Sequence, residues 1–196
     1  MKTRFFDLIF TIPGLIILSP LLLIIYVLVI FDSKGGGFYL QKRVGRNNKD
    51  FNLFKFRTME LGSDAKGLLT IGGNDSRITK IGVFLRKYKL DELPQLFNVL
   101  NGSMSLVGPR PEVSKYVSLY NEEQLKVLSI KPGITDYASL QYFSENELLA
   151  KSNNPEQTYI NEIMPEKLRL NLLYIKNKNI KTDFLIILKT IGRILK

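Results

Sequence analysis

The stretch that decides the fold lies near the N-terminus and reads Leu8-Ile-Phe-Thr-Ile-Pro-Gly-Leu-Ile-Ile-Leu-Ser-Pro-Leu-Leu-Leu-Ile-Ile-Tyr-Val-Leu-Val-Ile-Phe31. It holds twenty-four residues without a charge, between Asp7 and Asp32. An α-helix of this length measures roughly 36 Å, which is enough to cross the roughly 30 Å hydrocarbon core of a bilayer. The segment therefore predicts a membrane helix. A cleaved signal peptide fits less well, because the run is too long and no small-residue cleavage site follows it.

Ser19-Pro20 lies at the midpoint of this helix. Pro20 has no amide hydrogen to donate to the carbonyl of Ile16, so the helix should kink there. The Ser19 hydroxyl can compensate by donating to the carbonyl of Leu15 or Ile16. A sharp bend leaves two arms of roughly 18 Å, about half a bilayer each, and predicts a re-entrant helix-break-helix. A kinked helix that spans the bilayer is the alternative.

The charges that flank the apolar stretch indicate its orientation. Basic residues mark the cytoplasmic side of a membrane segment, and here they stand on both sides of it. They are Lys2 and Arg4 before it, and Lys34, Lys42, Arg43 and Arg46 after it. We therefore expect a membrane anchor over residues 1–34 and a cytoplasmic domain over residues 35–196, with a Gly35-Gly36-Gly37 hinge between them.

The rest of the chain is predicted to be mainly α-helical with little β-structure. Phe51 to Phe56 alternates apolar and polar residues and predicts a strand, and Phe38 to Val44 is a short strand-like or irregular segment. Residues 63–74 are glycine-rich and predict a loop. Pro132-Gly133 predicts a turn.

Four further segments have helical patterns. They are Ile78 to Leu100, interrupted by Pro94 and stopped at Asn101-Gly102; Glu112 to Leu128; Pro165 to about Tyr174; and Ile180 to Leu195. The last is amphipathic and basic, which is typical of a helix that lies in the headgroup region of a membrane. Packing on the domain core explains its periodicity equally well.

The composition limits the chemistry that the chain can perform. Its 196 residues include no histidine and no cysteine, so acid, base, nucleophile or metal chemistry falls mainly to carboxylates. A bound metal would be a hard cation such as Mg²⁺ with oxygen ligands. Asp91 and Glu92 are adjacent carboxylates in Leu90-Asp-Glu-Leu-Pro-Gln-Leu96. Pro94 should place this pair at a kink or at a fresh helix start, where an anionic phosphate is favoured.

The formal net charge of +10 is concentrated in one stretch. From Lys34 to Lys89 there are thirteen Lys or Arg residues against four acids. A phosphorylated substrate, anionic lipid or nucleic acid would each fit that charge. A membrane-anchored basic scaffold or nucleic-acid-binding protein without catalysis is therefore the alternative to an enzyme. Nucleic acid is the less favoured partner, because no nucleic-acid-binding signature is visible.

One long block of sequence indicates the function more specifically than the amino-acid composition does. It reads Ser76-Arg-Ile-Thr-Lys-Ile-Gly-Val-Phe-Leu-Arg-Lys-Tyr-Lys-Leu-Asp-Glu-Leu-Pro-Gln-Leu-Phe-Asn-Val-Leu-Asn-Gly-Ser-Met-Ser-Leu-Val-Gly-Pro-Arg-Pro111. This block resembles the minimal form of the bacterial sugar transferase family, the monotopic polyprenyl-phosphate phosphoglycosyl transferases. Four shorter motifs extend the resemblance: Gln41-Lys-Arg-Val-Gly45, Phe54-Lys-Phe-Arg-Thr-Met59, Lys131-Pro-Gly-Ile-Thr135 and Ser19-Pro20. The resemblance covers nearly the whole chain.

The resemblance implies transfer of a sugar 1-phosphate from a UDP-sugar to undecaprenyl phosphate, with release of UMP, at the cytoplasmic face of the bacterial inner membrane. Such a step begins a surface glycan, which makes downstream glycosyltransferases natural partners beside the membrane lipids. In the family pattern Asp91 is the nucleophile of a ping-pong route through a phosphosugar-aspartyl intermediate. Glu92 assists the incoming polyprenyl phosphate as base or orienting group. Mg²⁺ near Asp91 would neutralise the diphosphate charge.

Basic residues of the same motifs are candidates for phosphate binding. Arg110, between Pro109 and Pro111, has a restricted backbone and a guanidinium suited to bidentate phosphate contact. Arg86, Lys55 and Arg57 are further candidates, with lipid headgroups or structural ion pairs as the alternative for each. The chain departs from the family pattern at Asp136-Tyr-Ala-Ser139, where glycine, a hydrophobic residue and Ala-Gln are usual. This departure leaves the identity of the sugar open.

Overall fold

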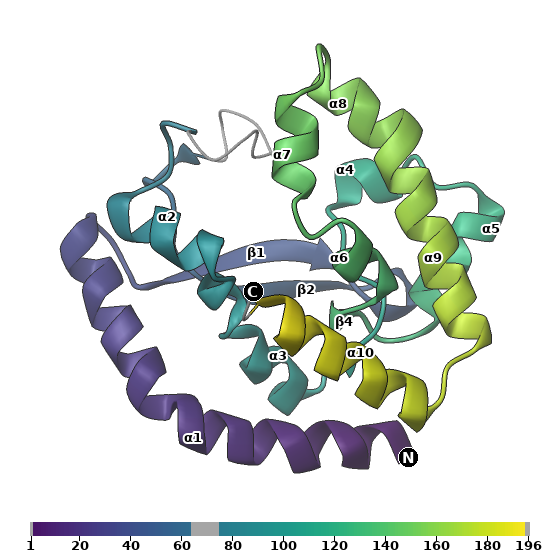
Figure 1. The fold of residues 1–196 in the computed structure, drawn as a ribbon, viewed down its shortest axis with the longest axis horizontal. Helices are drawn as coiled ribbons and strands as arrows, with labels where there is room; N and C mark the ends of the chain where they lie inside the picture. The colour runs from purple at the N-terminus through teal and green to yellow at the C-terminus, as the bar shows by residue number, and fades with distance from the viewer. Residues whose placement is uncertain (1, 64–74, 195–196) are drawn as a thin grey trace.

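A computed structural model describes residues 2–63 and 75–194, and helices dominate it, as the sequence predicts (Figure 1). The elements of the first half are α1 Lys2–Asp32, β1 Phe38–Val44, η1 Arg46–Asn48, β2 Asp50–Phe56, α2 Lys80–Lys87, η3 Leu90–Glu92, α3 Gln95–Asn101 and β3 Ser105–Val107. Those of the second half are α4 Ser114–Val117, α5 Glu122–Leu125, η4 Lys126–Ser129, β4 Gly133–Thr135, α6 Tyr137–Gln141, α7 Glu145–Ala150, α8 Pro155–Thr158, η5 Tyr159–Ile163, α9 Met164–Lys176 and α10 Ile180–Ile194. The predicted loop at 63–74 lies, apart from Ser63, outside the described residues.

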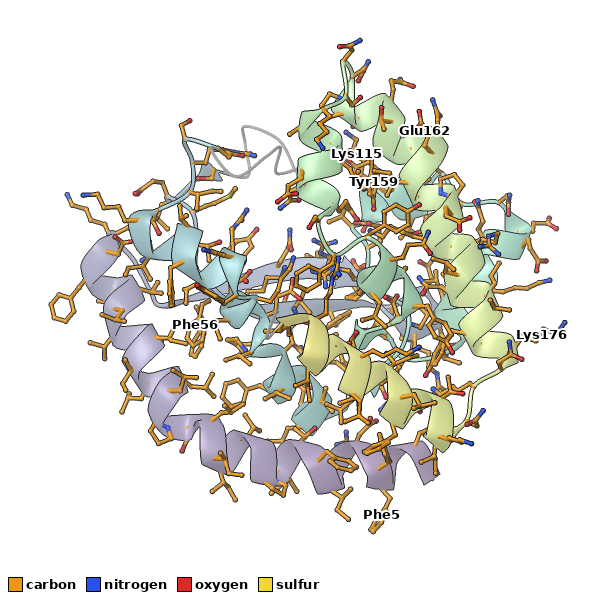
Figure 2. All side chains as sticks on the ribbon, viewed as in Figure 1. Phe5, Phe56, Lys115, Tyr159, Glu162 and Lys176 are labelled. Carbon is orange, nitrogen blue, oxygen red and sulfur yellow. The ribbon has the colours of Figure 1, made fainter. Side chains whose placement is uncertain are left out.

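Helix α1 is one continuous, bent helix along one side of the molecule, without the helix break predicted at Ser19-Pro20 (Figure 1). Within the described part of the chain, it alone is long and apolar enough to cross a membrane, by length and composition. The Ser19 hydroxyl donates to the carbonyl of Ile16 over 2.8 Å, one of the two acceptors predicted for it beside Pro20. Leu22 and Ile25 are buried against Phe56, whereas Phe5 points away from the body of the protein (Figure 2). One face of α1 therefore packs on the domain and the other remains apolar and exposed.

The N-terminal end of α1 is attached to the domain by charged side chains. Asp7 is buried, and its carboxylate accepts hydrogen bonds from the Ser105 hydroxyl at 2.8 Å and the Leu106 amide at 3.0 Å. Arg4 donates to the carbonyl of Leu100 at 2.7 Å. Because each bond joins α1 to α3 or β3, this end is fixed beside the start of β3.

The C-terminal end of α1 is attached to the same domain. The Asp32 carboxylate accepts a 2.9 Å hydrogen bond from the amide of Ile81 in the first turn of α2. Arg57, directly after β2, donates to the carbonyls of Ser33 and Gly36, each at 2.8 Å, and also to that of Lys34. Both ends of the apolar helix thus contact one body.

Two small sheets lie inside the ring of helices. Strands β1 and β2 pair antiparallel from Phe38 opposite Phe56 to Val44 opposite Asp50, which confirms both strand predictions. Strands β3 and β4 pair in parallel and have only three residues each. A Cβ on Gly133 would lie 2.0 Å from the amide nitrogen of Gly108, so this pairing requires glycine. The turn predicted at Pro132-Gly133 is wrong, since Gly133 is the first residue of β4.

The helical predictions are confirmed in part. The segment from 78 to 100 is broken before Pro94, as predicted, into α2, η3 and α3, and Gly102 ends α3 with a left-handed φ of 88°. Helices α9 and α10 match their predicted ranges. The continuous helix predicted over 112–128 is wrong, since α4, α5 and η4 replace it. Asn121 starts a new helix there, with its side chain and that of Gln124 forming a capping box.

Helix α10 has two apolar faces with different surroundings. Ile186 and Asp183 are buried, and the Asp183 carboxylate accepts a 2.6 Å hydrogen bond from the Tyr174 hydroxyl of α9. The opposite face leaves Phe184, Leu185, Leu188 and Ile191 exposed. Core packing therefore explains one face only, and the exposed apolar face is available for a membrane surface.

Candidate active site

The Asp91-Glu92 pair occupies a single 3₁₀ turn between α2 and α3. Helix α2 begins at a Thr79 cap, whose hydroxyl accepts from the Gly82 amide at 3.0 Å. Lys89 adopts a left-handed φ of 55°, which reverses the chain before the turn. Such a conformation costs roughly 1–2 kcal/mol for a residue with a side chain. The two carboxylates therefore stand on a constrained turn between two helices.

Glu92 is held by two cations. Arg110 donates to both carboxylate oxygens of Glu92, over 3.0 Å from Nη1 to Oε2 and more closely from Nη2 to Oε1. The Lys55 ammonium lies 3.2 Å from Oε1. Burial alone would raise the pKa of Glu92, but Arg110 and Lys55 outweigh it and hold the pKa well below its usual range. Glu92 is therefore ionised and a weak proton acceptor.

Asp91 has a different environment. Its side chain is buried, and its Oδ1 accepts no hydrogen bond from any residue that the structure describes. Burial raises the pKa of Asp91, and the charge of Glu92 raises it further. Lys55 and Arg86 oppose that rise without cancelling it. A buried carboxylate oxygen without a partner points to a ligand that completes its surroundings.

Both carboxylates line a cavity of about 540 Å³ that is open to the surface. This volume is in the usual range for small-molecule sites, about 300–1,000 Å³. Its charged lining comes from strands, turns and helices far apart in the sequence: Arg43, Lys55, Arg86, Lys89, Asp91, Glu92, Arg110, Glu112, Glu145 and Lys167. The cations outnumber the carboxylates, so the cavity is suited to an anionic ligand.

The structure brings together five of the six predicted catalytic and substrate-binding residues. Asp91, Glu92, Arg110, Arg86 and Lys55 all line the large cavity. Arg86 donates from Nε to the Thr58 hydroxyl at 2.8 Å, which directs its guanidinium.

Arg57 does not line this cavity. It is buried, and three backbone carbonyls after α1 accept from its guanidinium. Its geometry is that of a structural tether to backbone carbonyls, a role that differs from the structural ion pair considered for it from sequence.

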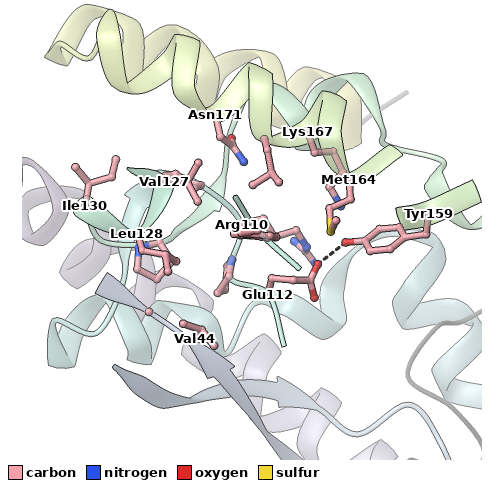
Figure 3. Close-up of a pocket in the computed structure, with 16 residues that line it drawn as sticks. Val44, Arg110, Glu112, Val127, Leu128, Ile130, Tyr159, Met164, Lys167 and Asn171 are labelled. Atoms are coloured by element: carbon pink, nitrogen blue, oxygen red, sulfur yellow. Dashed lines mark hydrogen bonds between the residues drawn. The ribbon is translucent and has the colours of Figure 1, made fainter. Parts of the chain in front are cut away.

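A second ionic cluster, which the sequence did not predict, lies in the wall of the same cavity. Arg43 donates to Glu112 at 2.9 Å. Tyr159 donates to the other oxygen of that carboxylate, the hydrogen bond that Figure 3 shows as a dashed line. Burial would raise the pKa of Glu112, but Arg43 and Lys167 lower it below its usual value. Arg43 lies in a quoted motif and Glu112 follows Pro111, but their contact joins residues 69 positions apart.

Asp136 is a further residue whose role the sequence did not reveal. It is fully buried, and its Oδ2 accepts from the backbone amide of Arg110 at 3.0 Å. Its Oδ1 accepts from the Ser139 amide at 2.6 Å and so caps α6. The departure from the family pattern at 136–139 therefore includes a residue that positions Arg110, and Ala138 and Ser139 line the cavity.

A family model described as bacterial sugar transferase matches residues 1–196. The chain belongs to the bacterial sugar transferase family.

Relatives of known name agree with this membership. An Aeromonas hydrophila protein named UDP-N-acetylgalactosamine-undecaprenyl-phosphate N-acetylgalactosaminephosphotransferase is 35% identical over 98% of this chain and 43% of its own length. A Xanthomonas campestris protein named UDP-glucose:undecaprenyl-phosphate glucose-1-phosphate transferase is 37% identical over 96% of this chain and 38% of its own length. The chain thus spans about two fifths of these two relatives. The exopolysaccharide production protein ExoY of Rhizobium meliloti is 33% identical over 97% of this chain and 84% of its own length.

The oxygen ligands that this sugar transferase could offer a magnesium ion are limited. No group of three or more acidic side chains that would hold a metal occurs among residues 2–63 and 75–194. Both oxygens of Glu92 are engaged by cations, whereas Asp91 has an unpartnered oxygen. Mg²⁺ commonly uses one or two carboxylates together with waters and substrate phosphates. Asp91 alone therefore suffices as the protein ligand.

Proposed function

We propose that this sugar transferase moves a sugar 1-phosphate from a UDP-sugar to undecaprenyl phosphate, releases UMP, and so begins a surface glycan. The observation that carries the proposal is Asp91, a buried carboxylate without a hydrogen-bond partner among the described residues, in a cavity with more cations than carboxylates. The names of the relatives support an undecaprenyl-phosphate acceptor and a nucleotide-sugar donor. Phosphoryl transfer depends mainly on positioning and on charge stabilisation, which such a cavity supplies.

The proposed route has two displacements at one phosphorus atom. First, a carboxylate oxygen of Asp91 attacks the β-phosphorus of the UDP-sugar, and the bond to the bridging oxygen breaks as UMP leaves. The product is a phosphosugar-aspartyl intermediate. Next, a phosphate oxygen of undecaprenyl phosphate attacks the same phosphorus, and the bond to Asp91 breaks. The raised pKa of Asp91 supports this role, because a more basic carboxylate is a stronger nucleophile.

Glu92 serves this route as an orienting group in the proposal. A carboxylate with a pKa well below its usual range is a poor base, so the base role considered from sequence is less well supported. Its contacts with Arg110 and Lys55 instead fix two cations at the cavity wall. These cations, with Arg86, are placed to bind the donor diphosphate.

We include Mg²⁺ as a cofactor, held by Asp91 together with substrate oxygens. When bound, it would neutralise charge on the diphosphate and so favour the approach of a carboxylate. Arg86 and Lys55 offset part of that charge in any case. Chelation of divalent cations should therefore reduce the rate of UMP release, and added MgCl₂ should restore it.

We propose a re-entrant topology for α1 in the bacterial inner membrane, with the catalytic domain on the cytoplasmic face. Its support is that Asp7 and Asp32, at opposite ends of the apolar stretch, both accept hydrogen bonds from the same domain. A straight span would carry one end across the bilayer, away from its partners. Ser19 and Pro20 mark the bend. A monotopic anchor also brings the active site to the surface where a lipid-linked phosphate resides.

The deciding experiment measures UMP release by purified protein with undecaprenyl phosphate, Mg²⁺ and a panel of UDP-sugars. We expect turnover with at least one sugar and its loss in the Asp91→Asn variant. Asp50→Asn is the matched control, since Asp50 is an exposed partner of Lys42 far from the cavity. Without acceptor, the wild-type protein should yield a phosphosugar adduct at Asp91 by mass spectrometry. Full turnover by Asp91→Asn would exclude the nucleophile assignment, and oligonucleotide binding without UMP release would favour the scaffold alternative.

A further inference from the structure

Two cations meet on one aromatic ring, Phe143, which lines the large cavity together with Lys89. The Lys89 ammonium lies 5.2 Å from the centre of the Phe143 ring, and the Arg193 guanidinium lies 5.5 Å from it. Both distances are within the range of cation–π attraction, up to about 6 Å. Lys89 belongs to the turn that carries Asp91, Phe143 to the connection between α6 and α7, and Arg193 to the last turn of α10. The ring therefore joins the catalytic turn to the amphipathic helix.

Neither cation forms a direct ion pair within the described part of the chain, although the charge of Lys89 lowers the pKa of Asp91 and of Glu92. No carboxylate among those residues forms an ion pair with Lys89 or Arg193, whereas Lys55 and Arg110 share Glu92. Two unpaired cations on one ring repel each other, and the ring offsets only part of that repulsion. An anion bound between them would relieve it. These two cations therefore lie outside every ion pair formed by the described residues.

The lining of this cavity is continuous with an apolar surface. Ile191 and Ile194 of α10 line the same cavity as Lys89, and Ile191 also belongs to the exposed face with Phe184 and Leu188. An anion joined to a long hydrocarbon chain can thus place the chain along α10 and its charge at Arg193. A nucleoside diphosphate sugar has no such chain, and the inner cations Arg86, Arg110 and Lys55 suit its diphosphate.

We propose that Lys89, Phe143 and Arg193 form a capture site for the phosphate of the lipid acceptor, distinct from the inner cations that hold the donor. This proposal rests on the proposed function and deepens it by assigning the two phosphate-bearing substrates to different cations. Phe143 acts as a positioning residue that keeps the two cations together. In this proposal the phosphate of the acceptor first binds Arg193. It then contacts Lys89, which belongs to the turn that carries Asp91.

The test separates the two substrates kinetically in neutral detergent micelles, where no anionic phospholipid competes. Arg193→Gln and Phe143→Leu should each raise the KM for undecaprenyl phosphate about tenfold, equivalent to about 1.4 kcal/mol. The KM for the UDP-sugar and the yield of UMP without acceptor should stay at the wild-type values. Arg193→Lys should restore most of the acceptor affinity, because it keeps the charge. Lys189→Gln, one turn earlier on α10, is the matched control and should change neither KM.

Other outcomes would contradict the proposed acceptor site. An equal rise in both KM values, or no change in either, would exclude a separate acceptor site. An effect seen only in anionic vesicles and absent in neutral micelles would assign the cations to bulk phospholipid instead. Thermal unfolding of each variant checks that it is folded. Equilibrium binding of undecaprenyl phosphate needs no turnover, so it tests the capture site even if no UDP-sugar gives UMP, a result that would reject the proposed function.

Discussion

Glu92 and Arg110 form the pair on which the geometry of the site depends. Two guanidinium nitrogens meet two carboxylate oxygens, an arrangement that the single ammonium of lysine cannot reproduce. We expect Arg110→Lys to lower kcat/KM for UMP release at least tenfold, with little loss of thermal stability because the charge remains. Arg169→Lys is the matched control, since Arg169 makes the same bidentate contact with Glu166 on the surface. Equal activities of the two variants would contradict the importance of the bidentate contact.

Glu112 should make the stability of the protein depend on pH. Its pKa in the folded protein lies below the ordinary value of about 4.5, because Arg43 and Lys167 outweigh the effect of burial. A lowered pKa means that its stabilising effect is present above about pH 4.5 and is lost as the pH falls through the folded-state pKa. The melting temperature in detergent should therefore fall less steeply with acidification, from pH 5 downward, in Glu112→Gln than in wild type.

The same substitution should also destabilise the protein at neutral pH, by about 3 kcal/mol, because Arg43 loses a buried partner. Glu156→Gln is the control, since the ion pair of Glu156 with Lys115 is exposed. Parallel pH curves for wild type and Glu112→Gln would show that this carboxylate does not cause the acid sensitivity.

At the residue scale, the sequence identified the two carboxylates of the candidate site but not all of their surroundings. The absence of histidine and cysteine singled out Asp91 and Glu92, and both line the cavity. Arg57 lies in the same quoted motif as Lys55, yet it faces the chain after α1. Strand β2 ends at Phe56, so the alternation that places Lys55 does not extend to Arg57. A motif alone carries no information about that change of direction.

Among the secondary-structure elements, the end of α1 depends on Arg57. We expect Arg57→Gln to lower the free energy of unfolding by about 3 kcal/mol, since it removes charged hydrogen bonds to buried carbonyls. The KM values of the protein that remains folded should not change, because Arg57 lies outside the cavity. Arg46→Gln serves as the control, since Arg46 is exposed. A raised donor KM with unchanged melting temperature would instead support substrate contact.

The parallel contact of β3 with β4 is a second element on which the site depends. Gly133→Ala should prevent it, because the added Cβ would overlap the backbone of Gly108, and Arg110 and Asp136 follow those two strands. We expect a low yield of folded protein and a loss of UMP release. Gly192→Ala, in open space on α10, should be neutral or slightly stabilising. Normal folding of Gly133→Ala would show that the strands can separate without harm.

These strands also show why the sequence prediction of elements was incomplete. A three-residue strand is too short to display alternation, and its partner lies about 28 residues away. The long or strongly periodic segments α9 and α10 were predicted with nearly correct limits, whereas α1 begins at Lys2, six residues before the apolar stretch. Asn121 is a helix-start residue inside the range predicted as one helix, and its capping box with Gln124 was the overlooked signal.

For the whole molecule, the sequence indicated an apolar helix followed by a mainly helical domain, and the structure has that arrangement (Figure 1). The sequence alone could not show which residues come together in the candidate site. Arg43, Lys55 and Asp91 come from three different elements, and Arg110 and Glu112 from the connection between β3 and α4. Only their packing shows which cations face which carboxylates. The hydrogen bonds at both ends of α1 likewise belong to the packed molecule, and they lead to a test of its topology.

Single cysteines at the two ends of α1 provide that test, because the chain contains no other cysteine. A re-entrant helix places Lys2→Cys and Lys34→Cys on the same, cytoplasmic side. Both should resist a membrane-impermeant maleimide in intact cells and react after permeabilisation. Lys126→Cys, on an exposed part of the domain, is the control for cytoplasmic reactivity. A helix that spans the bilayer would expose Lys2→Cys in intact cells. That result would also require Arg4 and Asp7 to leave their partners in α3 and β3, at the cost of a buried carboxylate interaction.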